Sequence, residues 1–320
     1  GAACGLSHAL GRENAMFAIG HQDLDRLFRA SEFALPEEAA ILFGLRGALP
    51  TNEVDFEPRS ARNVELREID NLHPRCTIGL WDRKSEAVAL FAGSTVPWKG
   101  AIQQSIPKGG LGTNQLMESY VTYVPGMHPG NKGPESQHKA FIQSGDFPHR
   151  RTRDDLDFDQ DDDVFVAFPG DNLHSAFCES SSKPFKSSFG CQVVCGFPKR
   201  KAGNLVDVGP WPRFRDLALG SRQKSYRYAL VQGRDAQAAA TTPQGALAAK
   251  LYYGSEGDLT AKVQKALKAN GFPAIVVDGD FGRGTLAAVV AFQKRSGLNG
   301  DGIVGQNTAD ALGIGAWPRF

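Results

Sequence analysis

Apolar residues in the first 55 positions recur at helical spacing. They form two sets: Leu24, Leu27 and Phe28, and, behind Pro36-Glu37-Glu38, Ile41, Leu42 and Leu45. Residues at i, i+3 and i+4 share one face of a helix, and proline followed by acids is typical of a first helical turn. The pattern predicts a helical N-terminal segment over residues 1–55.

From about residue 77 the pattern changes to short runs of β-branched and aromatic residues. Two of them, Thr77–Trp81 and Ala87–Phe91, flank the turn sequence Asp82-Arg83-Lys84-Ser85 and predict a hairpin. The other predicted strands are Tyr120–Val124, Val164–Phe168, Gln192–Cys195 and Tyr226–Val231. Long loops at 125–134 and 150–163, rich in Gly, Pro and Asp, are where a binding cleft is expected. Residues 56–236 are therefore expected to form a mainly β domain.

A stretch of small and polar residues without periodicity, 237–249, follows this domain and is typical of a linker. Beyond it, one helix face is predicted from Leu259, Val263, Ala266 and Leu267. Asp258 is expected to cap the start of this helix, and Gly271 is expected to end it.

A short internal repeat comes next. Asp278–Thr285 reads Asp-Gly-Asp-Phe-Gly-Arg-Gly-Thr, and Asp301–Thr308 reads Asp-Gly-Ile-Val-Gly-Gln-Asn-Thr. The glycines suit tight turns, and Thr285 and Thr308 are expected to be the N-caps of the helices that follow. With Ala288–Gln293 between the two copies, the order resembles the peptidoglycan-binding module family over residues 250–320. The resemblance implies an all-α three-helix domain that holds the chain at a bacterial cell wall.

Length and composition fit two globular units. The chain has 320 residues, 41% hydrophobic and 22% charged, with a net charge of +1, which excludes the strong positive field of a nucleic-acid-binding protein. No run approaches the roughly 20 apolar residues of a membrane span, and the first residues lack the basic and apolar regions of a signal peptide. We expect peptidoglycan as the partner and an extracytoplasmic location, periplasmic or secreted, with the export route and oligomeric state left open.

Five cysteines, an odd number, leave at least one free thiol in a monomer. Cys191 follows Gly190 in Ser188-Phe189-Gly190-Cys191-Gln192, and His174 lies upstream across a stretch rich in Ser, Lys and Pro. A histidine brought beside a thiol assists its attack as a nucleophile. The amides of Phe189, Gly190 and Cys191 suit an oxyanion hole, which acyl transfer from an amide requires.

This arrangement resembles the catalytic domain of the L,D-transpeptidase family, whose pattern is a histidine, a variable loop and then Ser-x-Gly-Cys. The resemblance, over about residues 75–200, implies catalytic roles for Cys191, His174, Ser188 and Gly190 and substrate contacts by His138, Phe189 and Gln192. It also implies attack on a stem-peptide amide and a thioacyl-enzyme that is passed to water or to an amine, so that the enzyme is an L,D-carboxypeptidase or an L,D-transpeptidase. Val193 stands where the family has arginine, which leaves recognition of the substrate carboxylate open.

Two other functions remain as alternatives. A zinc peptidase or amidase would use His128, His138 and His149 with the acids of 154–163, but the sequence has no ligand-spaced set such as HExxH, and we expect no metal or cofactor. The acidic run 157–161 resembles the start of a calcium loop but lacks its glycine and closing glutamate, so a solvated acidic loop is expected. The second alternative is a non-catalytic wall-binding interaction protein.

The sequence therefore predicts a multidomain α+β protein. Its parts are a helical segment (1–55), a mainly β domain like the L,D-transpeptidases (56–236), a linker (237–249) and an all-α peptidoglycan-binding domain (250–320). Whether the target wall belongs to the producer or to a competitor stays open.

Overall fold

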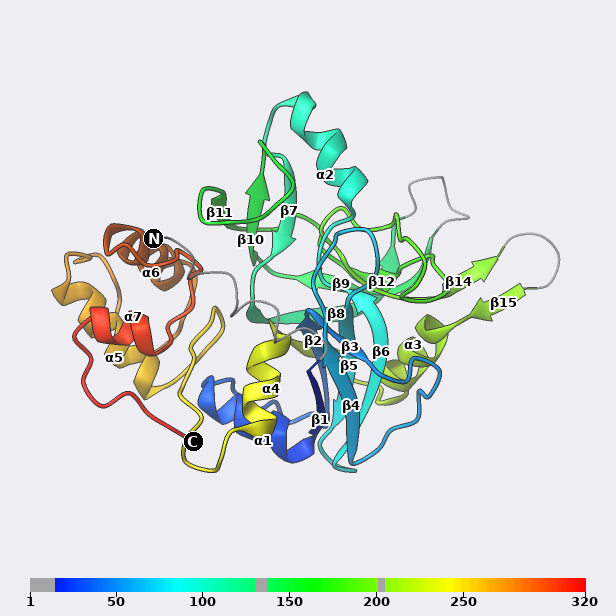
Figure 1. The fold of residues 1–320 in the computed structure, drawn as a ribbon, viewed down its shortest axis with the longest axis horizontal. Coiled ribbons are helices and arrows are strands. Elements are labelled where there is room, and N and C mark those ends of the chain that lie inside the picture. Colours follow the sequence, from blue (N-terminus) through cyan, green and yellow to red (C-terminus); the bar gives the residue numbers. More distant parts are fainter. Residues whose placement is uncertain (1–14, 130–136, 201–204) are drawn as a thin grey trace, which may run out of the picture.

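The computed structural model describes residues 15–129, 137–200 and 205–320; Cys4 and residues 130–134 of one expected loop lie outside these ranges. Its centre is a closed barrel of eight strands, with the helical C-terminal module at one side (Figure 1). The barrel strands, in spatial order, are β12 (Leu173–Ser175), β13 (Gln192–Val194), β6 (Ala87–Ser94), β5 (Cys76–Asp82), β2 (Ala40–Arg46), β16 (Tyr226–Gln232), β8 (Ser119–His128) and β9 (His138–Ser144).

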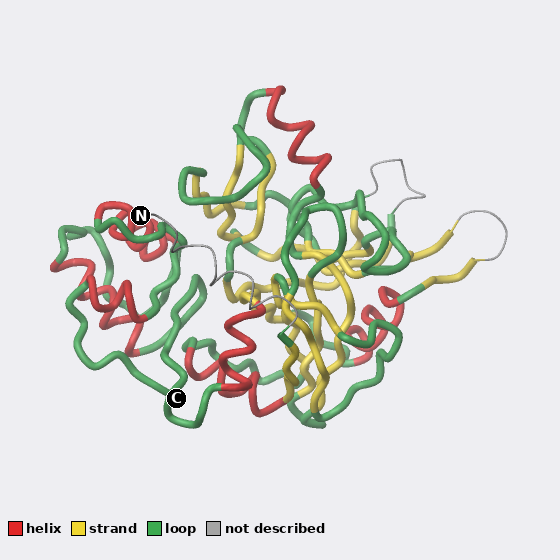
Figure 2. Tube along the Cα trace, in the orientation of Figure 1, coloured by secondary structure: helices red, strands yellow, loops and turns green. Residues whose placement is uncertain are grey.

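The described residues also form three smaller sheets and eight helical segments, the last three of which belong to the C-terminal module. The sheets are β1 (Met16–Gly20) with β4 (Ala61–Leu66) and β3 (Ala48–Pro50); β11 (Asp163–Ala167) with β10 (Phe147–Thr152) and β7 (Thr113–Leu116); and β14 (Phe197–Arg200) with β15 (Leu205–Val208). The helices are α1 (His21–Ala30), α2 (Lys99–Ser105), a 3₁₀ turn (Ile106–Lys108), α3 (Pro210–Gly220), α4 (Gly233–Thr241), α5 (Asp258–Ala269), α6 (Arg283–Arg295) and α7 (Gln306–Ala311). Among the described residues, no helix is both long and apolar enough to cross a bilayer. The prediction of a mixed α+β fold, with a large β-rich part followed by helices, is confirmed (Figure 2).

The β-type runs were identified correctly from the sequence. The predicted hairpin is β5 paired antiparallel with β6, and the four other predicted strands correspond to β8, β11, β13 and β16. Aromatic side chains of β8 and β16, among them Tyr123 and Tyr228, are fully buried inside the barrel. Runs rich in β-branched and aromatic residues and bounded by turn sequences therefore predict these strands correctly.

The N-terminal segment is not wholly helical as expected. Only His21–Ala30 is helical there, and Ala40–Arg46, expected as the second helix, is strand β2 between β5 and β16. All seven residues of β2 are buried, because helices cover one face of this strand and the barrel interior covers the other. A short apolar run buried on both faces has no period that distinguishes strand from helix.

The expected linker also begins within a helix. Residues 237–241 belong to α4, whose Ala236 and Ala239 are buried in the cluster that includes α1. Alanine favours helix without providing a large apolar side chain, so the segment shows no amphipathic pattern.

The C-terminal module consists of α5, α6 and α7 around one apolar core. The N-caps are Gly257, Gly282 and Gly305, one to three residues before the expected positions; Asp258 is the first residue of α5, while Thr285 and Thr308 lie in the first turns of α6 and α7. Two buried glutamines that precede the Asp-Gly loops explain the repeat. Gln264 donates to Asp278 Oδ1 and Thr285 Oγ1, and Gln293 donates in the same way to Asp301 Oδ1 and Thr308 Oγ1.

The module is packed against the barrel rather than tethered at a distance. The Glu32 carboxylate accepts hydrogen bonds from the amides of Leu259 and Thr260, both at 2.8 Å, and so caps α5 from a distant part of the chain. The Tyr120 amide of β8 donates to the Tyr253 carbonyl at 2.8 Å. These contacts give the two parts a defined relative position.

Candidate active site

His174 and the residue after Cys191 are carried by neighbouring parallel strands. In the pairing of β12 with β13, Leu173 lies opposite Gln192 and His174 opposite Val193. Alternate residues of a strand share one face, so Cys191 and Val193 lie on the same side; both belong to one buried cluster, whereas Leu173 and Val194 belong to the barrel core. His174 therefore shares the outer face of the barrel with Val193, whose buried cluster includes Cys191.

The hydrogen bonding of His174 selects its tautomer. The ring is 1% exposed, and Nδ1 lies 2.8 Å from the Ser175 carbonyl oxygen. A carbonyl only accepts, so Nδ1 carries the proton and Nε2 carries the lone pair. Within the described part of the chain, Nε2 has no hydrogen-bond partner. It is therefore a buried base with a vacant lone pair.

Two further histidines surround this ring. His128 of β8 stacks on His174 with ring centroids 4.0 Å apart, and His138 of β9 lies 5.7 Å away in an edge-on arrangement. Burial, followed by the charges of these two neighbours, lowers the pKa of His174 well below its ordinary value. Burial and His138 lower the pKa of His128 to about 4. His128 and His174 are therefore neutral at neutral pH.

The thiol of Cys191 is in an environment that favours its protonated form. The residue is 8% exposed, and Sγ lies 3.7 Å from the Gly170 carbonyl oxygen. Burial, with a contribution from Asp171, raises the pKa of Cys191 to about 12. The resting site therefore holds a neutral thiol near a neutral imidazole.

A buried carboxyl lies beneath the loop that carries the thiol. Asn114 donates from Nδ2 to both oxygens of Asp171, at 2.7 and 2.6 Å, and burial raises the pKa of Asp171 to about 7. Gly190, at φ +141°, lies against this pair, because a Cβ there would approach Asn114 Nδ2 to 2.1 Å and Asp171 Oδ1 to 2.4 Å. The glycine is thus required for close packing. The sequence contained no signal for Asn114 or Asp171.

The remaining expected site residues differ in their burial and in whether a substrate could contact them. Ser188 Oγ donates to the Cys191 carbonyl at 2.7 Å and accepts from the Gly190 amide at 3.3 Å, so this amide of the expected oxyanion hole already has a partner. Gln192 is fully buried inside the barrel, where it accepts from the Tyr228 hydroxyl. Phe189, by contrast, is 49% exposed. Ser188 and Gln192 shape the loop, and Phe189 is the residue that faces solvent.

The histidines considered for zinc do not gather as a set. His149 lies on β10, with Nδ1 against the Phe147 carbonyl oxygen and its ring stacked on Phe165, apart from the histidine cluster. His128 and His138 do lie together, but with His174, and their rings contact one another by stacking and by edges. The sequence has no local pattern that predicts the stacking of His128 on His174.

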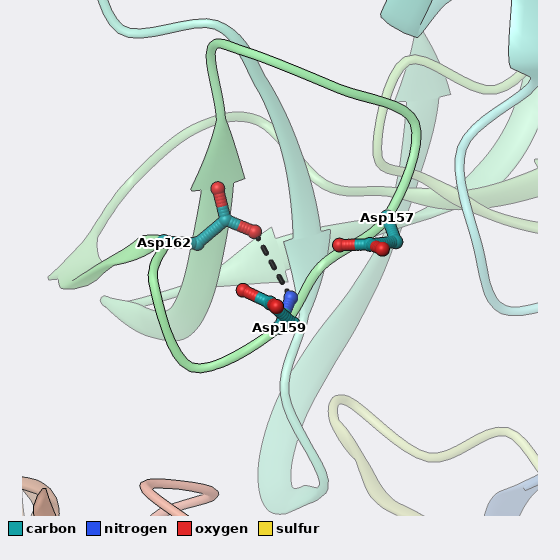
Figure 3. Close-up of side chains that lie close together, drawn as sticks. All are labelled: Asp157, Asp159 and Asp162. Carbon is teal, nitrogen blue, oxygen red and sulfur yellow. Dashed lines mark hydrogen bonds between the residues drawn. The ribbon is translucent and has the colours of Figure 1, made fainter.

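The acidic loop contains a cluster of three carboxylates, Asp157, Asp159 and Asp162 (Figure 3). Asp157 and Asp159 are exposed, and Asp162 accepts a hydrogen bond from the Asp159 amide at 3.1 Å. Burial raises the pKa of Asp162 to about 6. The buried carboxylate therefore already has a partner in the loop.

Comparison with known proteins characterises the C-terminal part. Residues 256–312 match the family model of the peptidoglycan binding domain. A curated relative from Bacillus licheniformis, named as an N-acetylmuramoyl-L-alanine amidase, is 43% identical over 61 residues, which are 18% of this chain and 17% of the relative. This chain thus spans about a sixth of that relative's length. No solved structure matches this chain. The chain carries a peptidoglycan-binding module at its C-terminal end.

Proposed function

We propose that the chain is a peptidoglycan-acting cysteine enzyme of the L,D-transpeptidase or L,D-carboxypeptidase type, held at the wall by its C-terminal module. Support comes above all from the parallel pairing of β12 with β13, which sets His174 and Cys191 on one face. The family match of residues 256–312 to a peptidoglycan binding domain supports peptidoglycan as the substrate, because its stem peptides contain amides that a thiol can attack.

In the proposed reaction, Cys191 Sγ attacks the carbonyl carbon of a stem-peptide amide while His174 Nε2 takes the thiol proton. The C–N bond then breaks, the leaving amine takes the proton from His174, and a thioester remains. Water or an acceptor amine next attacks the thioester, again giving a proton to His174, and the thiol is restored. Water yields a carboxylic acid, and an amine yields a new peptide bond.

Proton transfer during attack suits this site better than a resting ion pair. Because the pKa of Cys191 is about 12 and that of His174 is lowered, the resting protein contains a neutral thiol and a neutral imidazole rather than a thiolate and an imidazolium. The neutral imidazole offers its Nε2 lone pair to the thiol proton, but its lowered pKa makes it a weak base, so in the proposed reaction the proton moves only as Sγ bonds to the carbonyl carbon. In the proposed reaction, the Nε2 lone pair of His174 accepts the proton of the Cys191 thiol.

Arg151 is our candidate for recognising the substrate carboxylate in place of the arginine that Val193 replaces. Its charge acts on Asp171, which in turn acts on Cys191, so the guanidinium is within electrostatic range of the thiol site. Arg151 donates to the Gly112 carbonyl at 2.9 Å and is partly exposed. Among the described residues its other guanidinium donors have no partner, so they are available for a bidentate contact with a carboxylate.

An amidase or zinc peptidase is the second candidate, favoured by the name of the Bacillus licheniformis relative. To separate the candidates, purified protein is incubated with muropeptides and the products are identified by mass spectrometry, with and without a chelator. We expect cleavage or exchange at the stem peptide, unchanged by chelation and lost in His174→Ala. Release of the whole stem from the glycan, or loss on chelation with recovery on added zinc, contradicts the thiol mechanism. Unchanged muropeptides favour the non-catalytic alternative.

A further inference from the structure

A cavity of about 310 Å³ lies where the barrel, the sheet β11–β10–β7 and the C-terminal module meet. Barrel strands contribute Arg46 and Gln232, the region of β7 contributes Gln115 and Glu118, and the loop between α6 and α7 contributes Asn299 and Asp301. The cavity is therefore composite, and the module supplies part of its wall.

The walls of the cavity are held by buried arginines. Arg46 forms an ion pair with Glu118 at 2.9 Å, with only 7% and 10% of the two side chains exposed, and also donates to the carbonyls of Thr95 and Leu116. Arg150 donates to the Asp159 carbonyl and to the Gly300 carbonyl, which ties the β10 strand to the module loop. A site whose walls are fixed in this way is pre-formed.

Several polar groups that line the cavity are unused. Glu118 Oε1 accepts from Arg46 and Gln232, and Asp301 Oδ1 accepts from Gln293 and the Ile303 amide. Among the described residues, the second oxygen of each carboxylate, the side-chain amide of the half-buried Gln115 and that of the exposed Asn299 have no hydrogen-bond partner within the protein. Burial, with Glu118 contributing, raises the pKa of Asp301. Closely spaced unfilled acceptors and amide groups indicate a ligand rich in hydroxyl and amide groups.

Charge and shape narrow the ligand class further. Two arginines face three carboxylates, those of Glu118, Asp159 and Asp301, so the charges nearly balance and a strongly charged ligand has no advantage. Leu116, Met117 and Phe158 add an apolar wall. We propose that this cavity binds a neutral N-acetylated sugar unit of the glycan strand, an inference that rests on the peptidoglycan function proposed above.

The position of the cavity gives the sugar site a role. Asn114, which holds Asp171 beside the Cys191 loop, immediately precedes Gln115 on β7. Successive side chains of a strand point to opposite faces, with a rise of about 3.3 Å per residue, so Gln115 at the sugar site and Asn114 at the thiol site lie on opposite faces of β7. Because Asn299 and Asp301 of the module line the cavity, the module would contribute to binding the glycan as well as to anchoring the chain at the wall.

The test uses the full chain and a soluble trimer of N-acetylglucosamine, titrated by calorimetry. We expect saturable binding that Gln115→Ala and Asn299→Ala each weaken about tenfold, since each removes a neutral hydrogen-bonding group without an internal partner. Gln306→Ala is the matched control, because among the described residues the side-chain amide of Gln306, at the start of α7, bonds only Asp310, at 2.8 Å. Thermal melting checks that all variants remain folded.

Two outcomes would overturn the sugar site. They are absence of saturable binding by the native protein, and equal affinity in native protein and both variants. Co-sedimentation of the native protein with purified sacculi tests wall binding separately. Pelleting without trimer binding rejects the cavity alone, whereas failure of both rejects wall binding as well.

Discussion

The repeats of the C-terminal module and the histidine cluster of the barrel are assembled from contacts of different range. Gln264 reaches Asp278 and Thr285, no more than 21 residues away, and Gln293 repeats the pattern within 15. In the barrel, Asn172 meets His128 across 44 residues, and His174 stacks on the same ring. Local contacts leave a repeat in the sequence, whereas barrel closure brings together side chains that no local pattern connects.

Removing the proposed nucleophile is expected to cause the largest change, a loss of muropeptide turnover, while wall binding by the module is unchanged. Cys191→Ala should lower muropeptide turnover by at least about 10³-fold, because the thioester can no longer form. Cys195→Ala is the matched control, since this thiol is buried 3.7 Å from that of Cys178. Product formation by mass spectrometry and sacculus pelleting are measured together. Undiminished turnover by folded Cys191→Ala would end the thiol hypothesis.

Removing a glutamine of the internal repeat should lower the stability of the module without touching the proposed thiol site. Gln264→Ala should destabilise the protein by about 2–4 kcal/mol, because the amides of Asp278 and Gly279 and the Asp280 carbonyl lose their partner at once. Gln306→Ala, on the exposed side of α7, should change the free energy of unfolding by less than about 0.5 kcal/mol. Denaturant unfolding measures both. Equal stability of the two variants would show that the glutamine does not hold the loop.

Removing the contact between the barrel region and the module should lower the free energy of unfolding by a smaller amount. Glu32→Ala removes the carboxylate that caps α5, and we expect a loss of about 1 kcal/mol, typical of a helix N-cap. Glu37→Ala, an exposed acid of the same segment, serves as the control. Differential scanning calorimetry should show the loss in the unfolding of the module. An unaltered transition would mean that apolar packing alone holds the module.

The smallest effect expected is a pH dependence of the histidine cluster. The folded pKa of His128 is about 4 and the ordinary value is 6.5, so between these values the unfolded chain binds a proton that the folded protein does not. Stability therefore falls as the pH is lowered through this window. His128→Phe keeps an aromatic ring but cannot titrate, so its stability should fall less from pH 7.5 to pH 5.

We expect the two slopes for His128→Phe and the native protein to differ by under about 1 kcal/mol, because solvent reaches part of the His128 ring. Denaturant unfolding at both pH values measures the difference, and His73→Phe, at a surface histidine paired with Asp70, is a control. Parallel slopes for His128→Phe and the native protein would contradict the burial of a neutral His128.

Sequence alone was sufficient wherever the physical signal is local. The hairpin β5–β6, the helices α5 and α6 and the Asp-Gly repeat follow from turn chemistry and apolar spacing, and the order Ser-x-Gly-Cys led to Cys191 and His174 as candidates. Local patterns failed at β2 and α4. A strand buried on both faces has no distinctive period, and a helix built mainly from alanine has no large apolar face.

Only the tertiary structure showed which side chains surround His174 and Gly190 and where the module packs against the barrel. His128 stacks on His174 because β8, β9 and β12 meet in the closed barrel, and Gly190 is required because Asn114 and Asp171 lie beneath it. Glu32 caps α5 from 227 residues away. Each contact depends on which strands and helices become neighbours, and neighbours distant in sequence are chosen by the burial of the whole core rather than by any segment of it.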